Sequence, residues 1–390
     1  NALALRVVLA PNAFKGSFDA VEVAGAFEEA LAGRAEPVPA PMSDGGDGFL
    51  AVLRHHRPEV LAVSARVPDP AGRAISALWG WDPEEGAAYL ESAAAGGLRL
   101  LDPGLRDPLR ATSAGLGRLI RTAAGLAPAE IVIGLGGSAT VDAGLGMARE
   151  LGFGFEDDAG RPIERPADLP RLARIVPPSE PAVPDTTRVV ALADVTATLH
   201  GPDGAARAFG AQKGADPEGI ERLAEALERM EEAWQADLGA PADLAERPGA
   251  GAAGGLGAAL AAFLGAGIAS GSEWCSRLAR LDEALVGADG IVTGEGRFDR
   301  QSLGGKATGH ILALAQAAGV PAAVVCASHE KGTGESGAMI VDAAAIGSPP
   351  GEPLRRQDLV RMMGVVLDRW EAKRARSFAR PDGPDIFAPR

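Results

Sequence analysis

Three lysines of the chain stand in glycine-rich stretches, where a cation beside an accessible backbone is suited to binding phosphate. Lys15, Lys213 and Lys306 lie in the stretches NAFKGSF, FGAQKGA and LGGKATG. The chain has five lysines and 38 Lys plus Arg, so 38 − 5 = 33 of its basic residues are arginine. A compact ammonium fits beside a phosphate oxygen where a planar guanidinium is too bulky. We therefore predict that these three lysines bind phosphate.

The segment around the third lysine, TGEGRFDRQSLGGKATG at residues 293–309, is glycine-rich but is not an ordinary P-loop. A P-loop reads G-x-x-x-x-G-K-[ST]. Arg300 stands here in place of its first glycine, and Ala307 in place of its magnesium-binding hydroxyl. Any phosphate site in this segment must be built differently.

Residues 134–139, GLGGSA, support a competing prediction. They fit the dinucleotide-binding pattern G-x-G-x-x-[GA] after the apolar run EIVI, and Glu156 follows Gly136 by 20 residues. Against this, Gly144 and Gly146 fall where the supporting helix should run, and each costs about 1 kcal/mol there relative to alanine. An NAD(P)-dependent hydroxy-acid dehydrogenase is therefore kept as an alternative.

Phosphoryl transfer also needs carboxylates, which hold Mg²⁺ and take the proton of the acceptor hydroxyl. The candidates in glycine-rich or strand-end positions are Asp44, Asp47, Asp142, Asp194, Glu295 and Asp299. Asp194 ends the apolar run VVALA, so it is predicted either to accept backbone hydrogen bonds or to point into a cleft. Helix capping is the alternative role for Asp44 and Asp142. The histidines show no ligand spacing, so a histidine metal site is not expected.

Composition limits the possible partners. The net charge of −14 argues against binding to nucleic acid or an anionic membrane, which requires a basic surface. No run of 18 apolar residues is present, so no membrane span is expected. Cys275 and Cys326 show neither a metal-binding spacing nor a disulfide framework, which predicts a cytoplasmic protein.

The lysines and carboxylates are set among alternating strands and helices. Residues 5–10 form an apolar run followed by a loop and a helical pattern up to Gly33, and residues 285–326 repeat this order. Such alternation predicts a parallel sheet with ligands at the carboxyl ends of its strands. If both ends of the chain share one sheet, Lys15 and Lys306 lie on the same rim.

The middle of the chain has a different pattern. Period-two alternation at residues 66–92 predicts antiparallel strands, and the Pro- and Asp-rich stretch at about 156–187 predicts a surface loop. We therefore predict an α/β protein of two domains: a Rossmann-like parallel-sheet domain built from both chain ends, with a mixed α/β domain inserted. The predicted boundaries are 1–62 with 285–375 for the first, 63–284 for the second, and 376–390 for a tail.

The ordered sequence blocks resemble the type I glycerate kinases. Matching blocks are APNAFKGS, MSDGGDG, ATSAGLG, IGLGGSATVDAGLGM, ADVTATLHGPDGAARAFGAQKGA, GAGAAGGLGAAL and TGEGRFDRQSLGGKA, and the match runs from about residue 5 to residue 375. The resemblance implies a kinase, monomeric or homodimeric, that uses ATP and Mg²⁺ to phosphorylate glycerate in a cleft between two domains. The expected product is 2-phosphoglycerate.

The resemblance also suggests roles for individual residues. Asp194 is the first choice for the base and Asp299 the second, while Lys306 and Lys213 neutralise the transferred phosphate. The expected substrate-binding residues are Lys15, Ser43, Asp44, Arg297 and Gln301. The expected nucleotide-binding residues are Gly136, Gly137, Ser138, Gly254 and Gly255. The expected magnesium ligands are Asp44 and Glu295.

The chain departs from the family pattern at four positions beside the expected cleft. Ala197 and Thr198 replace an Asn-Pro-like pair, Ala211 replaces proline, and Val141 replaces asparagine. None of these changes removes a candidate lysine or aspartate. They bear on acceptor preference, and they keep open a second alternative, a non-catalytic ligand sensor on the same fold.

Overall fold

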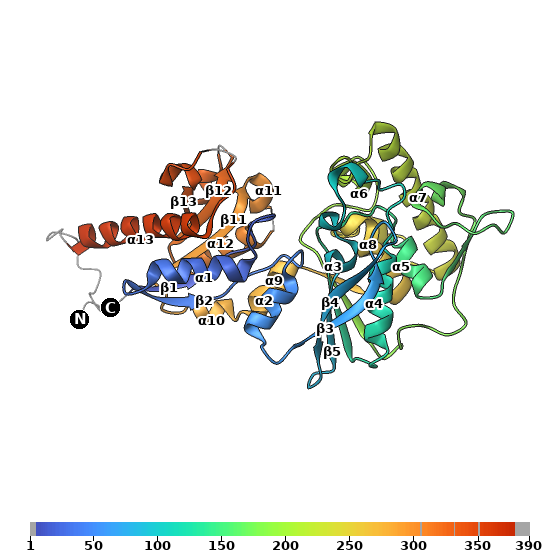
Figure 1. The fold of residues 1–390 in the computed structure, drawn as a ribbon, viewed down its shortest axis with the longest axis horizontal. Coiled ribbons are helices and arrows are strands. Elements are labelled where there is room, and N and C mark those ends of the chain that lie inside the picture. Colours follow the sequence, from blue (N-terminus) through green and yellow to red (C-terminus); the bar gives the residue numbers. More distant parts are fainter. Residues whose placement is uncertain (1–4, 305, 331, 350–351, 379–390) are drawn as a thin grey trace, which may run out of the picture. The chain divides into compact units, whose positions relative to one another are not determined.

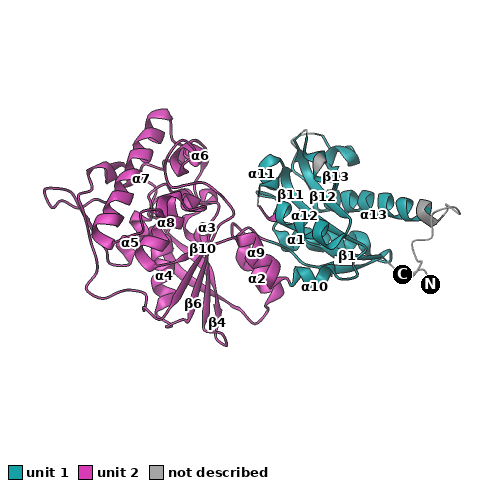
Figure 2. Cartoon of the chain, turned by 180° about the vertical axis from the view of Figure 1, so that it is seen from behind, with its two compact units in different colours: residues 1–42, 280–304, 308–390 teal, residues 43–279, 305–307 magenta. Residues whose placement is uncertain are grey.

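The computed structural model describes residues 5–304, 306–330, 332–349 and 352–378. The chain divides into two compact units (Figure 2). The first comprises residues 1–42, 280–304 and 308–390, and the second comprises residues 43–279 and 305–307. The prediction of an α/β protein, with one part built from both chain ends and another inserted between them, is confirmed.

The compact units divide after Met42 and Ala279. The segment after Met42 belongs to the second unit because the Leu50 amide donates to Glu91, at the end of a strand of that unit, and Phe49 makes an edge contact with Trp274 of the same unit. The predicted domain boundaries, 62/63 and 284/285, concern domains that fold independently, and they stay predictions. Of the predicted tail, residues 376–378 end the last helix, and residues 379–390 lie outside the described residues.

The first unit is built on a five-stranded parallel sheet (Figure 1). Its strands are β1 (Leu5–Leu9), β2 (Ala35–Pro39), β11 (Gly290–Phe298), β12 (Ala322–His329) and β13 (Met339–Asp342). They lie in the order β13-β12-β11-β1-β2. If the five strands are numbered 1 to 5 in chain order and the sheet is read from β2, the order is 2-1-3-4-5, a doubly wound pattern. The strand order reverses between β1 and β11. Ligands of such sheets bind outside the carboxyl ends of the strands at that point.

Helices cover both faces of this sheet. They are α1 (Ala20–Leu31), α10 (Leu281–Leu285), α11 (Arg300–Leu303), α12 (Ala307–Ala318) and α13 (Arg356–Phe378), with the short 3₁₀ turns η6 (Thr333–Ser336) and η7 (Ala343–Ile346). Helix α1 begins at a capping box in which Asp19 accepts from the Glu22 amide. Helices α1 and α13 share one apolar cluster with the sheet, while Leu312 of α12 packs in another cluster with Val324.

The second unit contains a six-stranded mixed sheet. Its strands are β3 (Leu61–Pro68), β4 (Ala74–Asp82), β5 (Ala87–Glu91), β6 (Glu130–Gly134), β9 (Arg188–Leu192) and β10 (Gly267–Ala269), in the order β10-β9-β6-β5-β4-β3. The pairs β3–β4 and β4–β5 are antiparallel, as the period-two alternation predicts. The pairs β5–β6, β6–β9 and β9–β10 are parallel.

The helices of the second unit lie on both faces of its sheet. They are α2 (Phe49–His56), α3 (Ser92–Gly96), α4 (Ala114–Ala124), α5 (Leu145–Glu150), α6 (Ala205–Phe209), α7 (Pro217–Leu238), α8 (Ala252–Leu264) and α9 (Gly271–Leu278). Helices α4, α5, α7 and α8 contribute to the main apolar cluster, which includes Trp79, Ile131 and Trp234. On the other face, Trp274 of α9 contacts Phe49 of α2 and Tyr89 of β5.

The stretch at about 156–187 is more ordered than the predicted surface loop. A small hairpin-like pair joins β7 (Gly154–Glu156) to β8 (Arg174–Val176), and a 3₁₀ turn, η3, spans Pro166–Arg171. The remaining 3₁₀ turns are η1 (Leu98–Leu100), η2 (Pro103–Leu105), η4 (Ala211–Lys213) and η5 (Leu244–Glu246). Within the described part of the chain, every helix is too short or too polar to cross a lipid bilayer.

Candidate active site

In the second unit, the carboxyl ends of three parallel strands carry candidate residues. Glu91 ends β5, the glycine-rich residues 135–138 follow β6, and Asp194 follows β9. The register pairs Glu91 with Gly134 and Gly134 with Leu192. These ends therefore stand side by side, at the position where parallel sheets bind their ligands.

The segment that contains Asp44 packs directly against the loop after β6. A Cβ atom on Gly134 would lie 2.2 Å from the carbonyl oxygen of Gly45, and one on Gly136 would lie 2.7 Å from the Cα of Gly46. Both positions need glycine because two backbones touch there. Two clusters predicted from separate parts of the sequence, MSDGGDG and GLGGSA, are thus brought together.

Asp194 is held by the first turn of α9. Ser270 Oγ donates to Asp194 Oδ1 at 2.8 Å, the Ser272 amide donates to Oδ2 at 3.0 Å, and Ser272 Oγ also donates to Oδ2. Burial raises the pKa of Asp194 to about 6, with a smaller contribution from the charge of Asp44, while the serine donors oppose the rise. A carboxylate with this pKa is ionised at neutral pH and can still accept a proton.

Ser43 and Asp44 shape their own loop. Ser43 is buried, and its Oγ accepts from the Gly45 amide at 3.1 Å. Asp44 Oδ1 accepts from the Gly46 amide at 2.9 Å. This bond closes a turn within the loop and is not a helix cap, because the N-cap of the helix that follows is Gly48, with no side-chain cap. The Asp44 carboxylate also acts electrostatically on Asp194.

Lys213 reaches the loop after β6 from η4. Its Nζ donates to Ser138 Oγ at 3.0 Å and to the Thr140 carbonyl oxygen at 2.8 Å. The side chain is only 4% exposed, and burial lowers its pKa to about 7 against an opposing effect of the Asp142 charge. Asp142 is fully buried and accepts from the Ser113 amide and hydroxyl, a structural role in holding two helix starts.

The glycines predicted at the start of α8 meet the same loop. Gly254 and Gly255 have φ values of +75° and +93°, which favour glycine. A Cβ atom on Gly254 would lie 1.9 Å from the Thr140 carbonyl oxygen, and the Ala143 amide donates to the Gly254 carbonyl at 3.2 Å. Of the predicted nucleotide-binding residues, Gly254 therefore packs against the loop that carries Gly136 and Ser138.

In the first unit, the remaining candidates gather at the reversal point between β1 and β11. The Asn12 amide donates to the Gly294 carbonyl at 2.8 Å, and a Cβ atom on Gly296 would lie 3.7 Å from the Lys15 amide nitrogen. The parallel β1–β11 pairing places the Lys15 loop beside the carboxyl end of β11. That Lys306 lies on the same rim stays a prediction, because residues 305–307 group with the second unit. Glu295 lies on β11 between Gly294 and Gly296.

Three more candidates follow at the end of β11. Asp299 caps α11, accepting from the Ser302 amide at 3.2 Å, and lies 3.7 Å from Arg297 in an exposed ion pair. Gln301 is exposed on α11. Lys306 immediately precedes α12 and is grouped with the second unit. Asp299 is thus committed to a helix cap, whereas Asp194 follows a buried strand.

The sequence alone did not identify Glu91, Ser270 and Ser272, which lie near the carboxyl ends of the strands of the second sheet. Glu91 is buried and accepts from the Leu50 amide at 2.5 Å at the start of α2, and burial raises its pKa. Its position at the end of the apolar run AAYLE is the same signal that identified Asp194. Ser270 is the N-cap of α9, as a capping pattern would predict, and Ser272 lies in the first turn of that helix, but the bonds of both to Asp194 join distant segments.

The carboxylates near Asp194 suit a magnesium ion whose other ligands are waters and substrate phosphates. Among the described residues, no three His, Cys, Asp or Glu side chains form a ready metal-binding group. Asp44 stands near Asp194, so carboxylate oxygen is available at this edge. Magnesium is usually bound by one or two carboxylates together with waters and substrate phosphates. The donor set fits that mode.

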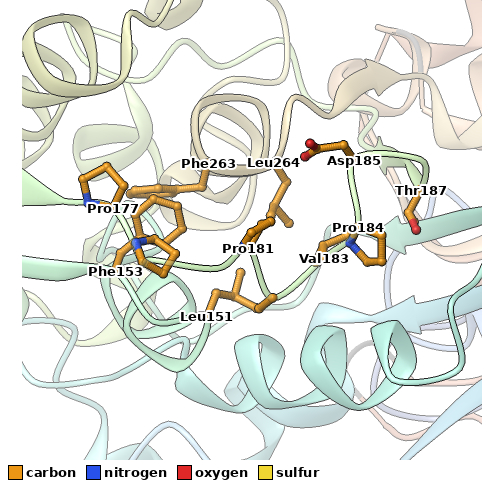
Figure 3. Close-up of a pocket in the computed structure, with 12 residues that line it drawn as sticks. Leu151, Phe153, Pro177, Pro181, Val183, Pro184, Asp185, Thr187, Phe263 and Leu264 are labelled. Carbon is orange, nitrogen blue, oxygen red and sulfur yellow. The ribbon is translucent and has the colours of Figure 1, made fainter.

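A cavity of about 330 Å³ lies elsewhere in the second unit (Figure 3). Its walls are mainly proline, leucine and phenylalanine side chains, including Phe153 and Phe263. It also includes Thr187 and Leu264, which precede β9 and β10. The cavity therefore lies near the amino ends of β9 and β10. The candidate active-site residues lie at the carboxyl ends of the strands, so the cavity is a different site.

The comparisons with known proteins agree on one family. Residues 7–355 match the model of the glycerate kinase family. The chain is 39% identical over 315 residues to glycerate 2-kinase of Escherichia coli K12, covering 77% of this chain and 80% of that protein. It is 36% identical over 307 residues to glycerate kinase of Haemophilus influenzae Rd, covering 77% and 80%.

A solved structure shows the same fold. The crystal structure of a candidate glycerate kinase 2 from Salmonella typhimurium LT2 superposes with a TM-score of 0.75 at 33% identity, covering 95% of this chain and 100% of that chain. The family match spans most of the sequence, and the fold agrees over nearly its whole length. The chain belongs to the glycerate kinase family.

Proposed function

We propose that the chain transfers the γ-phosphoryl group of ATP to glycerate with the help of Mg²⁺ and forms 2-phosphoglycerate, as the type I enzymes do. The single observation that carries the chemistry is Asp194, a carboxylate with a raised pKa at the carboxyl end of β9. In a member of this family, a carboxylate so placed is suited to removing the proton of the acceptor hydroxyl.

Asp194 is preferred to Asp299 as the base because of its surroundings. Two serine hydroxyls and one amide orient its carboxylate, while burial keeps its pKa close to the working range. Asp299 is tied to the first turn of α11 and to Arg297. We keep Asp299 as the second candidate, to be tested by the same substitution.

The cationic candidates are assigned to the substrates' negative charges. Lys306 and Lys15 are proposed to neutralise phosphate, and Arg297, with its planar fork, to hold the glycerate carboxylate. Ser43 and Gln301 would add hydrogen bonds to the substrate. When bound, Mg²⁺ would be held by Asp44 and Glu295 and would neutralise charge on the phosphate oxygens.

The nucleotide is assigned to the glycine-rich loops of the second unit. Gly136 is half-buried and Gly137 is exposed, so their backbone is within reach of a ligand, whereas Ser138, Gly254 and Gly255 are buried beside them. The candidates come from both units, so we propose that phosphoryl transfer depends on both.

One observation favours the kinase over the dehydrogenase alternative. A dinucleotide-binding loop leads directly into a helix whose amino end binds the pyrophosphate. Here α5 begins only at Leu145, six residues after the pattern ends at Ala139, and it spans only six residues. Asp142 fills the intervening loop with its own hydrogen bonds.

The decisive experiment measures ADP release with ATP, Mg²⁺ and a panel of small hydroxy acids. We expect release that depends on glycerate and that is abolished by chelating Mg²⁺. Proton coupling in the ³¹P spectrum then identifies the product, because a phosphate on C2 has one neighbouring proton and a phosphate on C3 has two. Binding without turnover would indicate a sensor, and NAD(P)H oxidation with a keto acid would indicate a dehydrogenase; either result ends the proposal.

A further inference from the structure

Lys213 is the most deeply buried of the candidate cations, and both hydrogen bonds of its ammonium group go to one loop. It ends η4 and directs its side chain into the second unit, where only 4% remains exposed. Its two hydrogen bonds, at 3.0 and 2.8 Å, end on Ser138 Oγ and the Thr140 carbonyl. Both acceptors belong to residues 135–144, the loop between β6 and α5.

That loop is anchored at each end by other contacts. At its start, the Leu98 amide donates to the Gly137 carbonyl and the Ala139 amide donates to the Gly96 carbonyl. At its end, Asp142 accepts from the Ser113 and Gly146 amides. The middle of the loop is the part that Lys213 holds.

The middle has few other polar contacts. The Thr140 hydroxyl is buried and has no hydrogen-bond partner among the described residues. The Thr140 carbonyl faces Gly254 so closely that only glycine fits there. A buried carbonyl without a hydrogen bond is destabilising, so the donor that Lys213 supplies to the Thr140 carbonyl has a structural purpose.

The charge state of Lys213 is consistent with a donor role. Burial lowers its pKa to about 7, although the nearby Asp142 carboxylate acts in the opposite direction. When the ammonium loses one proton, two N–H groups remain, and these match the two acceptors. Holding the loop therefore needs the donors, whereas neutralising a phosphate would need the positive charge.

We propose that Lys213 is a positioning residue, which fixes Ser138 and Thr140 within the loop that binds ATP, and that it does not touch the transferred phosphate. The assignment of ATP to this loop rests on the proposed function. The hold of Lys213 on the loop rests on the contacts alone. The two statements can therefore fail separately.

The first test is amide hydrogen exchange of the intact protein without substrates. In Lys213→Met, which keeps the unbranched stem as far as Cε but loses the donors, peptides covering residues 136–143 should exchange at least about tenfold faster, as expected for a lost charged hydrogen bond of about 1.5 kcal/mol or more. Lys373→Met, on the exposed face of α13, is the matched control and should leave this loop unchanged. Unaltered exchange in Lys213→Met overturns the proposal.

The second test is a double-mutant cycle in steady-state kinetics with Ser138→Ala. If Lys213 acts through Ser138, the two substitutions should not be additive. The kcat/KM for ATP of the double variant should then lie within about threefold of the value for the less active single variant. If Lys213 contacts the phosphate independently, the two losses should multiply, and the proposal fails. Lys213→Arg should not restore activity, because a guanidinium does not fit the buried slot; full rescue by arginine would also overturn it.

A folding defect in Lys213→Met would not prevent a decision. Ser138→Ala alone removes one of the two acceptors and should speed exchange at residues 138–140; a loop unchanged by this substitution overturns the proposal. If the wild-type protein releases no ADP with glycerate, the proposed function is lost, while the exchange data still decide whether Lys213 holds the loop.

Discussion

At the scale of single residues, the behaviour of Asp194 depends on a balance between burial and hydrogen bonding. Burial raises its pKa, and the hydroxyls of Ser270 and Ser272 lower it, with a net value of about 6. The base form is the carboxylate, so activity should fall as the pH drops through about 6 and should be constant above it. A pH profile of kcat/KM for glycerate measures this acid limb directly.

Asp194→Asn tests the same residue by substitution. The amide cannot take a proton, so kcat should fall by about 10²–10⁴, the usual contribution of a general base, with the fold unchanged. Asp158→Asn, in an exposed turn, is the control and should retain wild-type kcat. If Asp194→Asn stays within about tenfold of wild type, Asp299 becomes the base to test.

At the scale of elements, the start of α8 shows why glycine is needed at residue 254. Residues 253–255 have left-handed φ values of 53°, 75° and 93° inside the helix. This turn brings Gly254 against the loop after β6, where a Cβ atom would lie 1.9 Å from the Thr140 carbonyl oxygen. The glycine is required both by its conformation and by its neighbour.

Gly254→Ala should therefore destabilise the protein more than a left-handed φ alone would. Gly265→Ala is the matched control, because Gly265 has a φ of +64° with open space around its Cβ position. We expect about 1 kcal/mol for the control and at least about 2–3 kcal/mol more for Gly254→Ala, measured by urea unfolding. Equal losses at the two sites would mean that the contact with Thr140 is relieved at no cost.

The same contacts show how far the sequence could predict this site. Glycine clusters correctly marked loops that follow strands, around Asp44 and around Gly136. Whether a glycine serves a ligand or a neighbouring backbone is not visible in the sequence, because both need a missing Cβ; Gly134 and Gly254 are in contact with backbone. Tertiary contact decides between the two.

Residues far apart in the chain were also beyond prediction. Ser270 and Ser272 bind a carboxylate 76 and 78 positions away, so no local spacing connects them with Asp194. Prolines at about residues 156–187 suggested a loop, but η3 accommodates Pro170 inside a 3₁₀ turn and β8 pairs over only three residues. Short elements of this kind are stabilised by packing more than by local pattern.

At the scale of the whole molecule, each unit has its own apolar core. The cluster around Phe27, Val292 and Leu367 belongs entirely to the first unit, and the cluster around Ile131 and Trp234 belongs entirely to the second. The first core is assembled from both chain ends, so it closes only after the second unit has been synthesised. Separate cores predict that damage to one unit is felt mainly within it.

Phe27→Ala tests this separation. Phe27 lies fully buried on α1, and its truncation should cost about 3–5 kcal/mol. Hydrogen exchange should then increase in peptides from β1, β11 and β12, while peptides from β6 and β9 keep their protection. Trp234→Ala, in the other core, should give the reverse pattern. Equal loss of protection in all five strands after either substitution would show that the chain unfolds as one cooperative body despite its two cores.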